Sequence, residues 1–315
     1  MNRKFTHFAL YISLIVFACY VEPVGCQTPA NHLTVVYEFS FGGEGEEPGQ
    51  FRHPEGLSTD IRGNIYIADT GNNRIQKFDS RGRPISYIGG FGWASEQFQR
   101  PVDIYADKGL NVYVADYENH RIELYDKDLN WISSFYSQSS WEEKLQFSFP
   151  RSVCLSIHNE LFITDGEHNR ILKFNDQKEP EMSFGDFDWG QGGLTEPSQL
   201  YITRNDQVLV SDQGAGCIRL YDYYGNFLFD IGRDVLNIPK GLAVNKQGII
   251  FVADAGESQV VVFDSAGRTV AKIGSPGNKL GAFQNPSDVA LVENRLFVLD
   301  TDNNRVQVFT IEIVE

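Results

Sequence analysis

The chain has 315 residues, of which 42% are hydrophobic and 13% aromatic, and its formal net charge at pH 7 is −15. This apolar content is typical of a folded globular protein and excludes an intrinsically disordered chain. The acidic balance disfavours nucleic acid as a partner, because binding to nucleic acid depends on neutralising its phosphates. We therefore expect a folded protein whose partner is a protein, a peptide or a small polar ligand.

The first residues have the pattern of an export signal. Basic Arg3 and Lys4 precede an apolar run over residues 8–21, which is shorter than the ~20 residues of a membrane-spanning helix. This combination is typical of a secretory signal peptide. Residues 1–26 are therefore predicted to be a leader and residues 27–34 a short linker. The protein is expected to be exported, to the extracellular space or the periplasm.

Cys26 allows a second interpretation of this leader. Val24 and Gly25 place small residues before the cysteine, which resembles a bacterial lipoprotein signal and makes Cys26 a candidate for lipidation. An uncleaved leader would instead act as a membrane anchor. Contact with a membrane is expected only through such a lipid or through an uncleaved leader.

Residues 54–88 contain the pattern on which the rest of the chain is built. Short apolar runs at 56–60, 65–68, 74–78 and 84–88 are separated by turn segments that contain glycine. None of the runs has the length or the period of a helix. The pattern predicts four short strands, joined by tight turns into one antiparallel sheet.

Six copies of this unit follow one another along the chain. In each copy an aspartate ends the second strand and a proline opens the first strand. The aspartates are Asp69, Asp116, Asp165, Asp212, Asp254 and Asp300, and the prolines are Pro54, Pro101, Pro150, Pro197, Pro239 and Pro286. A four-stranded unit that recurs every ~45 residues is typical of a propeller blade. We predict one all-β domain over residues 35–315, a six-bladed β-propeller of four-stranded antiparallel blades.

The two ends of the repeat region complement each other. The last copy ends after its third strand at 306–310, whereas residues 35–41, before the first copy, match the fourth-strand segment at 85–90. We therefore expect the N-terminal strand to supply the outer strand of the last blade. Pairing the two ends in one sheet would close the ring and remove an exposed edge.

The turns after four of the aspartates resemble those of the NHL-repeat family, whose members form six-bladed β-propellers. In each turn an arginine follows the aspartate by five residues, and the pairs are Asp69 with Arg74, Asp116 with Arg121, Asp165 with Arg170, and Asp300 with Arg305. We expect a structural role, in which the aspartate caps the turn and the arginine returns to it across the hairpin.

Copies four and five depart from this motif. Cys217 and Gln259 stand at the arginine position, so these two turns are expected to lack the arginine. Cys217 is expected to be an exposed thiol in a turn, whereas Cys154 is expected to be a small buried residue of an inner strand.

A binding site is predicted at the central mouth of the ring, where the innermost strands begin. The residues that follow the opening prolines there are Glu55, Asp103, Arg151, Gln199, Lys240 and Asp288. Mixed charges that converge on one concavity suit a small polar ligand. The alternative is a solvated rim in which these side chains pair with one another. Trp93 and Trp189, in the links between blades, are further candidate contacts for a peptide or a carbohydrate.

The expected function is that of a non-catalytic scaffold that binds a ligand or a protein, and no catalytic residue is predicted. The alternative is a metal-dependent hydrolase or lyase with its site at the mouth. Similarity to the peptide-amidating lyase implies zinc held by histidines, but only His53 is close to the mouth. Similarity to gluconolactonase-like propellers implies calcium, which the acidic and amide residues at the mouth could hold. No cofactor is predicted, and calcium is the candidate to test. A purely structural envelope protein would have neither a ligand nor a metal.

Overall fold

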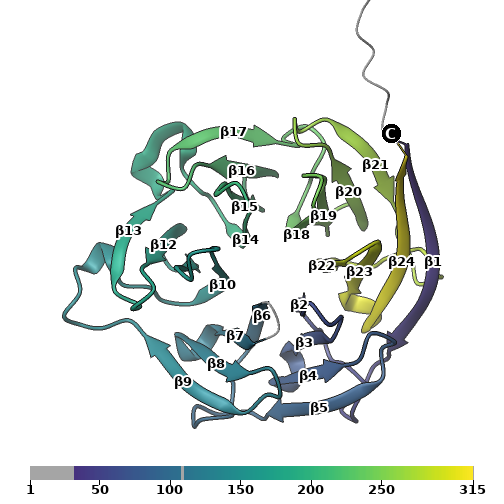
Figure 1. The fold of residues 1–315 in the computed structure, drawn as a ribbon, viewed down its shortest axis with the longest axis horizontal. Coiled ribbons are helices and arrows are strands. Elements are labelled where there is room, and N and C mark those ends of the chain that lie inside the picture. The colour runs from purple at the N-terminus through teal and green to yellow at the C-terminus, as the bar shows by residue number, and fades with distance from the viewer. Residues whose placement is uncertain (1–31, 108–109, 315) are drawn as a thin grey trace, which may run out of the picture. The chain divides into compact units, whose positions relative to one another are not determined.

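The computed structural model describes residues 32–107 and 110–314. In these residues, six four-stranded antiparallel sheets surround a central axis (Figure 1). The predicted all-β, six-bladed propeller is thereby confirmed. The predicted leader, with Cys26, lies outside the described residues, as do residues 27–31 of the predicted linker. No helix in the described part of the chain is both long enough and apolar enough to cross a membrane.

Blades one to three follow one another in chain order. Their strands are β2 (Gly56–Thr59), β3 (Ile65–Asp69), β4 (Arg74–Phe78) and β5 (Pro84–Gly89), then β6 (Pro101–Asp107), β7 (Asn111–Asp116), β8 (Arg121–Asp126) and β9 (Trp131–Tyr136), then β10 (Pro150–Leu155), β11 (Leu161–Asp165), β12 (Arg170–Phe174) and β13 (Pro180–Phe184). In each blade the first strand is innermost and the fourth is outermost.

Blades four to six repeat this order. Their strands are β14 (Pro197–Ile202), β15 (Val208–Asp212), β16 (Cys217–Tyr221) and β17 (Phe227–Ile231), then β18 (Pro239–Val244), β19 (Ile250–Asp254), β20 (Gln259–Phe263) and β21 (Thr269–Ile273), then β22 (Pro286–Val292), β23 (Arg295–Asp300), β24 (Arg305–Val314) and β1 (His32–Gly42). Short 3-10 helices stand at η1 (Thr70–Asn72), η2 (Tyr117–Asn119), η3 (Glu143–Leu145), η4 (Phe187–Gly192) and η5 (Thr301–Asn303).

The N-terminal strand closes the ring. β1 pairs antiparallel with β24, from His32 opposite Val314 to Gly42 opposite Arg305. Figure 1 shows purple β1 along the outside of yellow β24. This strand was predicted over residues 35–41 and begins three residues earlier, at His32. The two ends of the repeat region therefore share blade six, as the sequence predicts.

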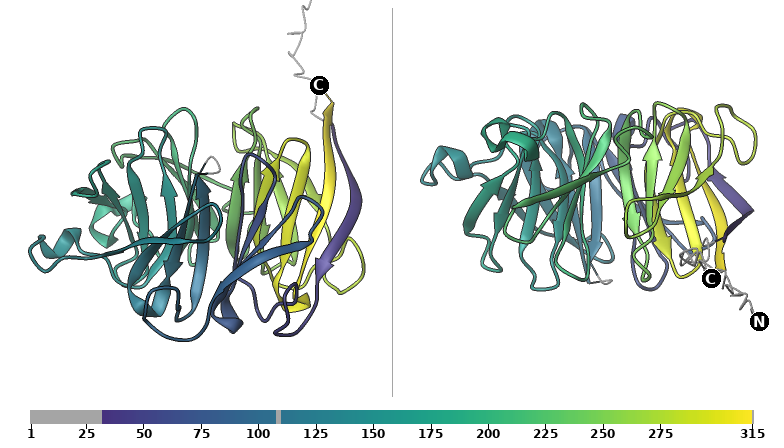
Figure 2. Two further views of the ribbon diagram at one scale, coloured as in Figure 1. Left: turned by 60° about the horizontal axis from the view of Figure 1, so that its bottom comes forward. Right: turned by 90° about the horizontal axis from the view of Figure 1, so that it is seen from above.

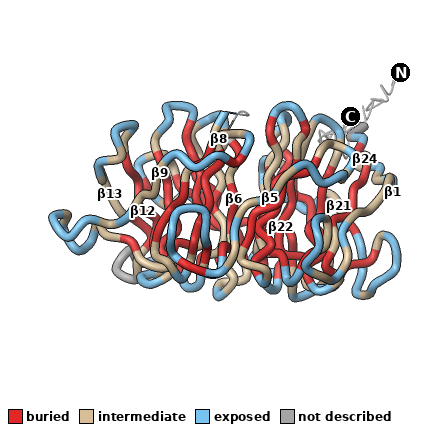
Figure 3. Tube along the Cα trace, turned by 90° about the horizontal axis from the view of Figure 1, so that it is seen from below, coloured by how far each residue is buried: buried red, intermediate tan, exposed pale blue. Residues whose placement is uncertain are grey.

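The hydrophobic core consists of six clusters, each shared by neighbouring blades. One cluster, for example, joins Tyr66 and Ile75 of blade one to Ile104 and Val114 of blade two. The inner strands are buried and the outer turns exposed (Figure 3), and the blades stand side by side around the axis (Figure 2). Because both faces of each sheet pack against another blade, the second strands are mostly apolar up to the aspartate that ends each of them. The rigid inner strands position the side chains near the axis.

The aspartate–arginine pairs tie each turn to the link that precedes its blade. Asp69 accepts hydrogen bonds from Arg74 Nε at 2.7 Å and from the Arg52 backbone N–H at 2.8 Å. The Arg74 guanidinium continues to the backbone oxygens of Glu47 and Gln50. The pairs at Arg121, Arg170 and Arg305 have the same Nε-to-carboxylate geometry.

Blade four differs from the prediction in two respects. Arg219, two residues beyond the expected position, donates from Nε to Asp212 at 2.9 Å, so this blade keeps an arginine next to its aspartate. Side chains two residues apart on a strand share a face, which allows the exchange. Cys217 is the first residue of β16 and is fully buried, so the expectation of an exposed thiol is wrong. Burial raises the pKa of its thiol to about 12.

Candidate functional site

A cavity of about 430 Å³ lies at the mouth of the ring. The residue directly after each opening proline lines it, and these six residues are Glu55, Val102, Arg151, Ser198, Lys240 and Ser287. The six innermost strands begin at the same face, and they therefore bring residues from all blades together around the axis (Figure 1). We call this space the mouth cavity.

Basic side chains with unused hydrogen-bonding capacity face the mouth cavity. Arg151 lies beside the Tyr117 ring, with its Cζ 5.8 Å from the ring centre, and Arg100 lies beside the same ring at 4.9 Å. Arg151 Nε is buried and has no acceptor among the described residues. The nearest ion pair in the cavity joins Arg100 to Glu55 at a long 3.7 Å. Because no hydrogen bond or ion pair of the described residues engages the Arg151 guanidinium, this side chain favours a ligand that supplies an anionic or carbonyl oxygen.

Lys240 adds a second cation to the mouth cavity. Its ammonium group donates to Asn285 Oδ1 at 2.9 Å, and it has no carboxylate partner among the ion pairs of the described residues. Burial lowers the pKa of the Lys240 ammonium group, while the charge of Glu55 acts in the opposite direction. An anionic ligand would therefore favour the charged form of this lysine.

The other three predicted residues lie one step deeper, in what we call the axial layer: Asp103, Gln199 and Asp288. Gln199 Nε2 donates to Asp288 Oδ1 at 3.0 Å and to Asp103 Oδ1 at 3.4 Å. Both aspartates are almost completely buried. The axial layer lies between the mouth cavity and a second cavity of about 240 Å³, which Leu57 and Cys154 help to line on the opposite side.

The axial layer has an approximate threefold pattern. Its members come from blades two, four and six, and each accepts a backbone N–H from the innermost strand of the following blade. These bonds run from Val153 to Asp103, from Leu242 to Gln199, and from Leu57 to Asp288. Blades one, three and five contribute small residues at the same depth, namely Gly56, Ser152 and Gly241. At Gly241 a Cβ atom would lie 2.2 Å from Asp288 Oδ1, so only glycine fits.

Burial dominates the electrostatics of the axial layer. It raises the pKa of the Asp103 carboxyl, against hydrogen bonds from Ser152 and Val153 that lower it. Burial and then the negative charge of Asp103 raise the pKa of Asp288 well above its usual range. The hydrogen bonds that both carboxyls accept oppose this effect of burial only in part.

The axial layer does not fit calcium or another metal ion. In the described residues, no group of three or more His, Cys, Asp or Glu side chains could hold a metal. The Gln199 Nε2 amide group faces both carboxylates, while its oxygen accepts the Leu242 N–H. A cation between Asp103 and Asp288 would meet these N–H groups instead of oxygen ligands. The geometry instead suits a hydrogen-bonded cluster of Asp103, Gln199 and Asp288 that fills the axis.

The predicted site residues thus separate into two levels. Glu55, Arg151 and Lys240 line the mouth cavity, and Asp103, Gln199 and Asp288 form the axial layer. The Trp93 side chain is 83% exposed and does not line the mouth cavity, whereas the Trp189 side chain lies outside the described side chains.

Sequence reasoning missed six residues that line the mouth cavity, and these are Arg100, Tyr117, Glu196, Gln213, Asn285 and Thr301. Arg100 directly precedes the opening Pro101, and Tyr117 directly follows Asp116 at the end of the second strand. The positions directly before each opening proline and directly after each repeat aspartate could have identified them.

The matched family model is the NHL repeat, at residues 51–78, 98–123, 236–263 and 283–309. Two curated relatives match part of the chain. The Protein brain tumor of Drosophila melanogaster is 24% identical over 41% of this chain, and the B-box type zinc finger protein ncl-1 of Caenorhabditis elegans is 45% identical over 16% of it. The matches span 13% and 6% of those two proteins.

Solved structures resemble the whole propeller at low sequence identity. A Bacteroides thetaiotaomicron protein of unknown function has a TM-score of 0.68 at 13% identity, covering 89% of this chain and 77% of its own. A Xanthomonas campestris gluconolactonase has a TM-score of 0.62 at 14% identity, covering 90% of both chains.

The virginiamycin B lyase of Staphylococcus aureus has a TM-score of 0.60 at 13% identity, covering 90% of this chain and 88% of its own. At such low identity these likenesses concern the fold alone. The chain is thus a six-bladed β-propeller that contains four matched NHL repeats.

Proposed function

We propose that this propeller is a binding scaffold whose mouth cavity receives a segment of a partner protein. The observation that carries the proposal is the Arg151 guanidinium at the mouth cavity, which takes part in no hydrogen bond or ion pair among those of the described residues. A peptide carbonyl or carboxylate in the cavity would supply an acceptor for this group. Lys240 and Arg100, in the same cavity, would add charge-assisted hydrogen bonds.

The scaffold would hold its ligand-binding side chains in fixed positions before the ligand binds. The six lining residues that follow the opening prolines sit at the start of the innermost strands, which are held within a sheet and by neighbouring blades. Little ordering of the protein is then needed when a ligand binds, so less interaction free energy is lost. Six blades can present six different side chains to one ligand without changing the fold.

A displayed library of random peptides, selected on the full chain, tests this proposal. Selected peptides are expected to bind Arg151→Ala and Lys240→Ala about tenfold more weakly than the parent chain, a loss of about 1.4 kcal/mol. Arg62→Ala is the matched control, because Arg62 is an exposed arginine in the turn before β3. Peptides that bind all variants equally would show that the mouth cavity is not the site.

A metal-dependent hydrolase or lyase is the second candidate, and it would require Gln199 to turn its amide oxygen toward Asp103 and Asp288, because its Nε2 group faces both carboxylates in the structure. Calcium titration of the full chain, followed by calorimetry, separates the two candidates. Tight binding of one ion that is lost in Asp288→Asn would favour the enzyme. Absence of heat in the parent chain would favour the scaffold.

We also propose that the protein is exported, on the basis of the leader pattern at residues 1–26. Fractionation of cells that express the full chain tests this location. Recovery in the membrane fraction that is lost in Cys26→Ser would support lipidation. An unchanged distribution of that variant would contradict it.

A further inference from the structure

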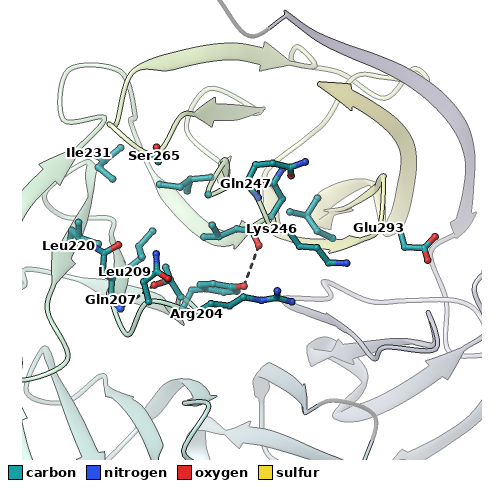
Figure 4. Close-up of a pocket in the computed structure, with 17 residues that line it drawn as sticks. Arg204, Gln207, Leu209, Leu220, Ile231, Lys246, Gln247, Ser265 and Glu293 are labelled. Carbon is teal, nitrogen blue, oxygen red and sulfur yellow. Dashed lines mark hydrogen bonds between the residues drawn. The ribbon is translucent and has the colours of Figure 1, made fainter. Parts of the chain in front are cut away.

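A larger cavity lies away from the mouth, between blades four and five. Its volume is about 580 Å³, and its walls come from the turns after β14 and β18 and from the facing strands. Figure 4 shows Leu209, Leu220 and Ile231 on the blade four side of this cavity. A volume of this size is within the range of ~300–1,000 Å³ typical of small-molecule sites. We call it the inter-blade cavity.

The inter-blade cavity stands where the repeat lacks an aromatic ring. Three residues before the repeat aspartate, five blades have a buried aromatic side chain, namely Tyr66, Tyr113, Phe162, Phe251 and Phe297. Blade four has Leu209 at this position, and Leu209 lines the cavity. The repeat therefore predicts a ring here that the chain does not supply.

Blade five does not supply a large side chain at this junction either. Tyr66 reaches across to blade two, where its hydroxyl donates to the Lys127 carbonyl at 2.9 Å. Phe162 likewise lies 5.7 Å from the Tyr223 ring of blade four. In blade five the equivalent turn residue is Ser265, which lines the cavity. A leucine and a serine thus meet at this junction, whereas blade one, which also has a serine at the turn position (Ser80), follows a blade with an aromatic residue, Phe297.

Two basic side chains border the cavity without an ionic partner. Arg204 and Lys246 lie in the turns after β14 and β18, both are exposed, and neither forms an ion pair or side-chain hydrogen bond in the described part of the chain. Glu293 also lines the cavity, but Figure 4 shows its carboxylate turned away from the two cations. Tyr201 adds an aromatic wall, anchored by a hydrogen bond from its hydroxyl to the Val244 carbonyl at 3.3 Å.

We propose that the inter-blade cavity binds a small aromatic carboxylate. The ring would enter the cavity over the apolar side chains of Leu209, Leu220, Ile231 and Ile250, which line it and are each at most 5% exposed. The carboxylate would lie at the rim, within reach of Arg204 and Lys246. The burial of apolar surface supplies affinity, and the two cations supply selectivity for an anion over a neutral analogue.

Hydrocinnamate is a suitable probe, because it joins a phenyl ring to a carboxylate, and hydrocinnamamide is its neutral match. Calorimetric titration of the full chain should detect hydrocinnamate at millimolar concentration or below, and hydrocinnamamide about tenfold more weakly. Leu209→Phe places the ring of the other blades in the cavity. It should weaken hydrocinnamate binding by about tenfold or more while the variant stays folded.

The contribution of the two cations, Arg204 and Lys246, is tested separately. Arg204→Ala with Lys246→Ala should reduce the preference for hydrocinnamate over hydrocinnamamide to about unity, whereas the exposed Arg62→Ala should keep it. No binding by the parent chain, equal binding by Leu209→Phe, or equal binding of the neutral analogue would each overturn the proposal. Because this cavity shares no lining residue with the mouth cavity, these outcomes leave the proposed function at the mouth untouched.

Discussion

Arg121 shows how a single guanidinium supports a whole turn. It is only 2% exposed, and its Nε lies 2.8 Å from both Asp116 and Glu123. Its other nitrogens donate to the backbone oxygens of Trp93 and Gln97 in the preceding link. A planar group with five donors can satisfy two buried carboxylates and a loop at once, which lysine could not do.

Replacing Arg121 with alanine should therefore destabilise the protein strongly. The variant leaves Asp116 and Glu123 buried without a cation, and the expected loss in free energy of unfolding is about 3–5 kcal/mol. Urea denaturation measures this loss. Gln259→Ala, at the equivalent position of blade five, is the control and should lose less than about 1 kcal/mol. Equal losses in the two variants would contradict the structural role of the arginine.

β1 is the element on which ring closure depends. It forms the outer strand of blade six and contributes Leu33, Val35 and Tyr37 to a cluster with Phe309 and Ile311. Without β1, the outer edge of β24 would expose unpaired N–H and C=O groups to other chains.

Deletion of residues 32–42 should lower the unfolding temperature and cause association, which size-exclusion chromatography and a thermal melt detect. A permuted chain offers the matched control. His32 lies opposite Val314, so a short turn inserted after Val314 can carry the same strand as a hairpin. This permutant should restore the elution volume and the stability of the parent chain. Failure of both forms alike would show that β1 acts by something other than pairing.

At the scale of the whole molecule, the axial layer joins blades that are far apart in the chain. Gln199 belongs to blade four, and its amide group donates to carboxylates of blades two and six. Burial raises the pKa of both Asp103 and Asp288. An added negative charge at this point would be opposed by both aspartates and by desolvation.

Gln199→Glu should therefore be destabilised in a pH-dependent way. A protonated introduced carboxyl can still donate to Asp288, so the variant should approach parental stability near pH ~4. The folded-state pKa of this carboxyl is expected to exceed its unfolded value, so stability is lost as pH rises through it, by about 3 kcal/mol or more at neutral pH. Urea denaturation across this pH range measures the difference. The exposed Gln177→Glu should show almost none, and parallel pH curves for the two variants would refute the interpretation.

Much of this architecture could be predicted because every blade buries the same pattern of apolar residues against its neighbours. The repeated prolines, aspartates and apolar runs are local patterns, and they predicted six blades, their strands and the closing strand at residues 35–41. The arginine of blade four was missed because a fixed spacing of five residues does not detect Arg219, which reaches Asp212 from the same face of the strand. Burial of Cys217 was missed because the residue was assigned to the turn, whereas it begins β16 and lies opposite Asp212 in the strand register.

The sequence by itself determined the number of blades, the order of their strands and the six positions that approach the axis. Only the tertiary structure decided that these positions divide into a mouth cavity and an axial layer. That division depends on which residues fill the axis at each depth and on bonds from Asp103, Gln199 and Asp288 to the backbones of following blades. The inter-blade cavity at Leu209 could be found only in the structure, because it forms where residues of different repeats meet in space.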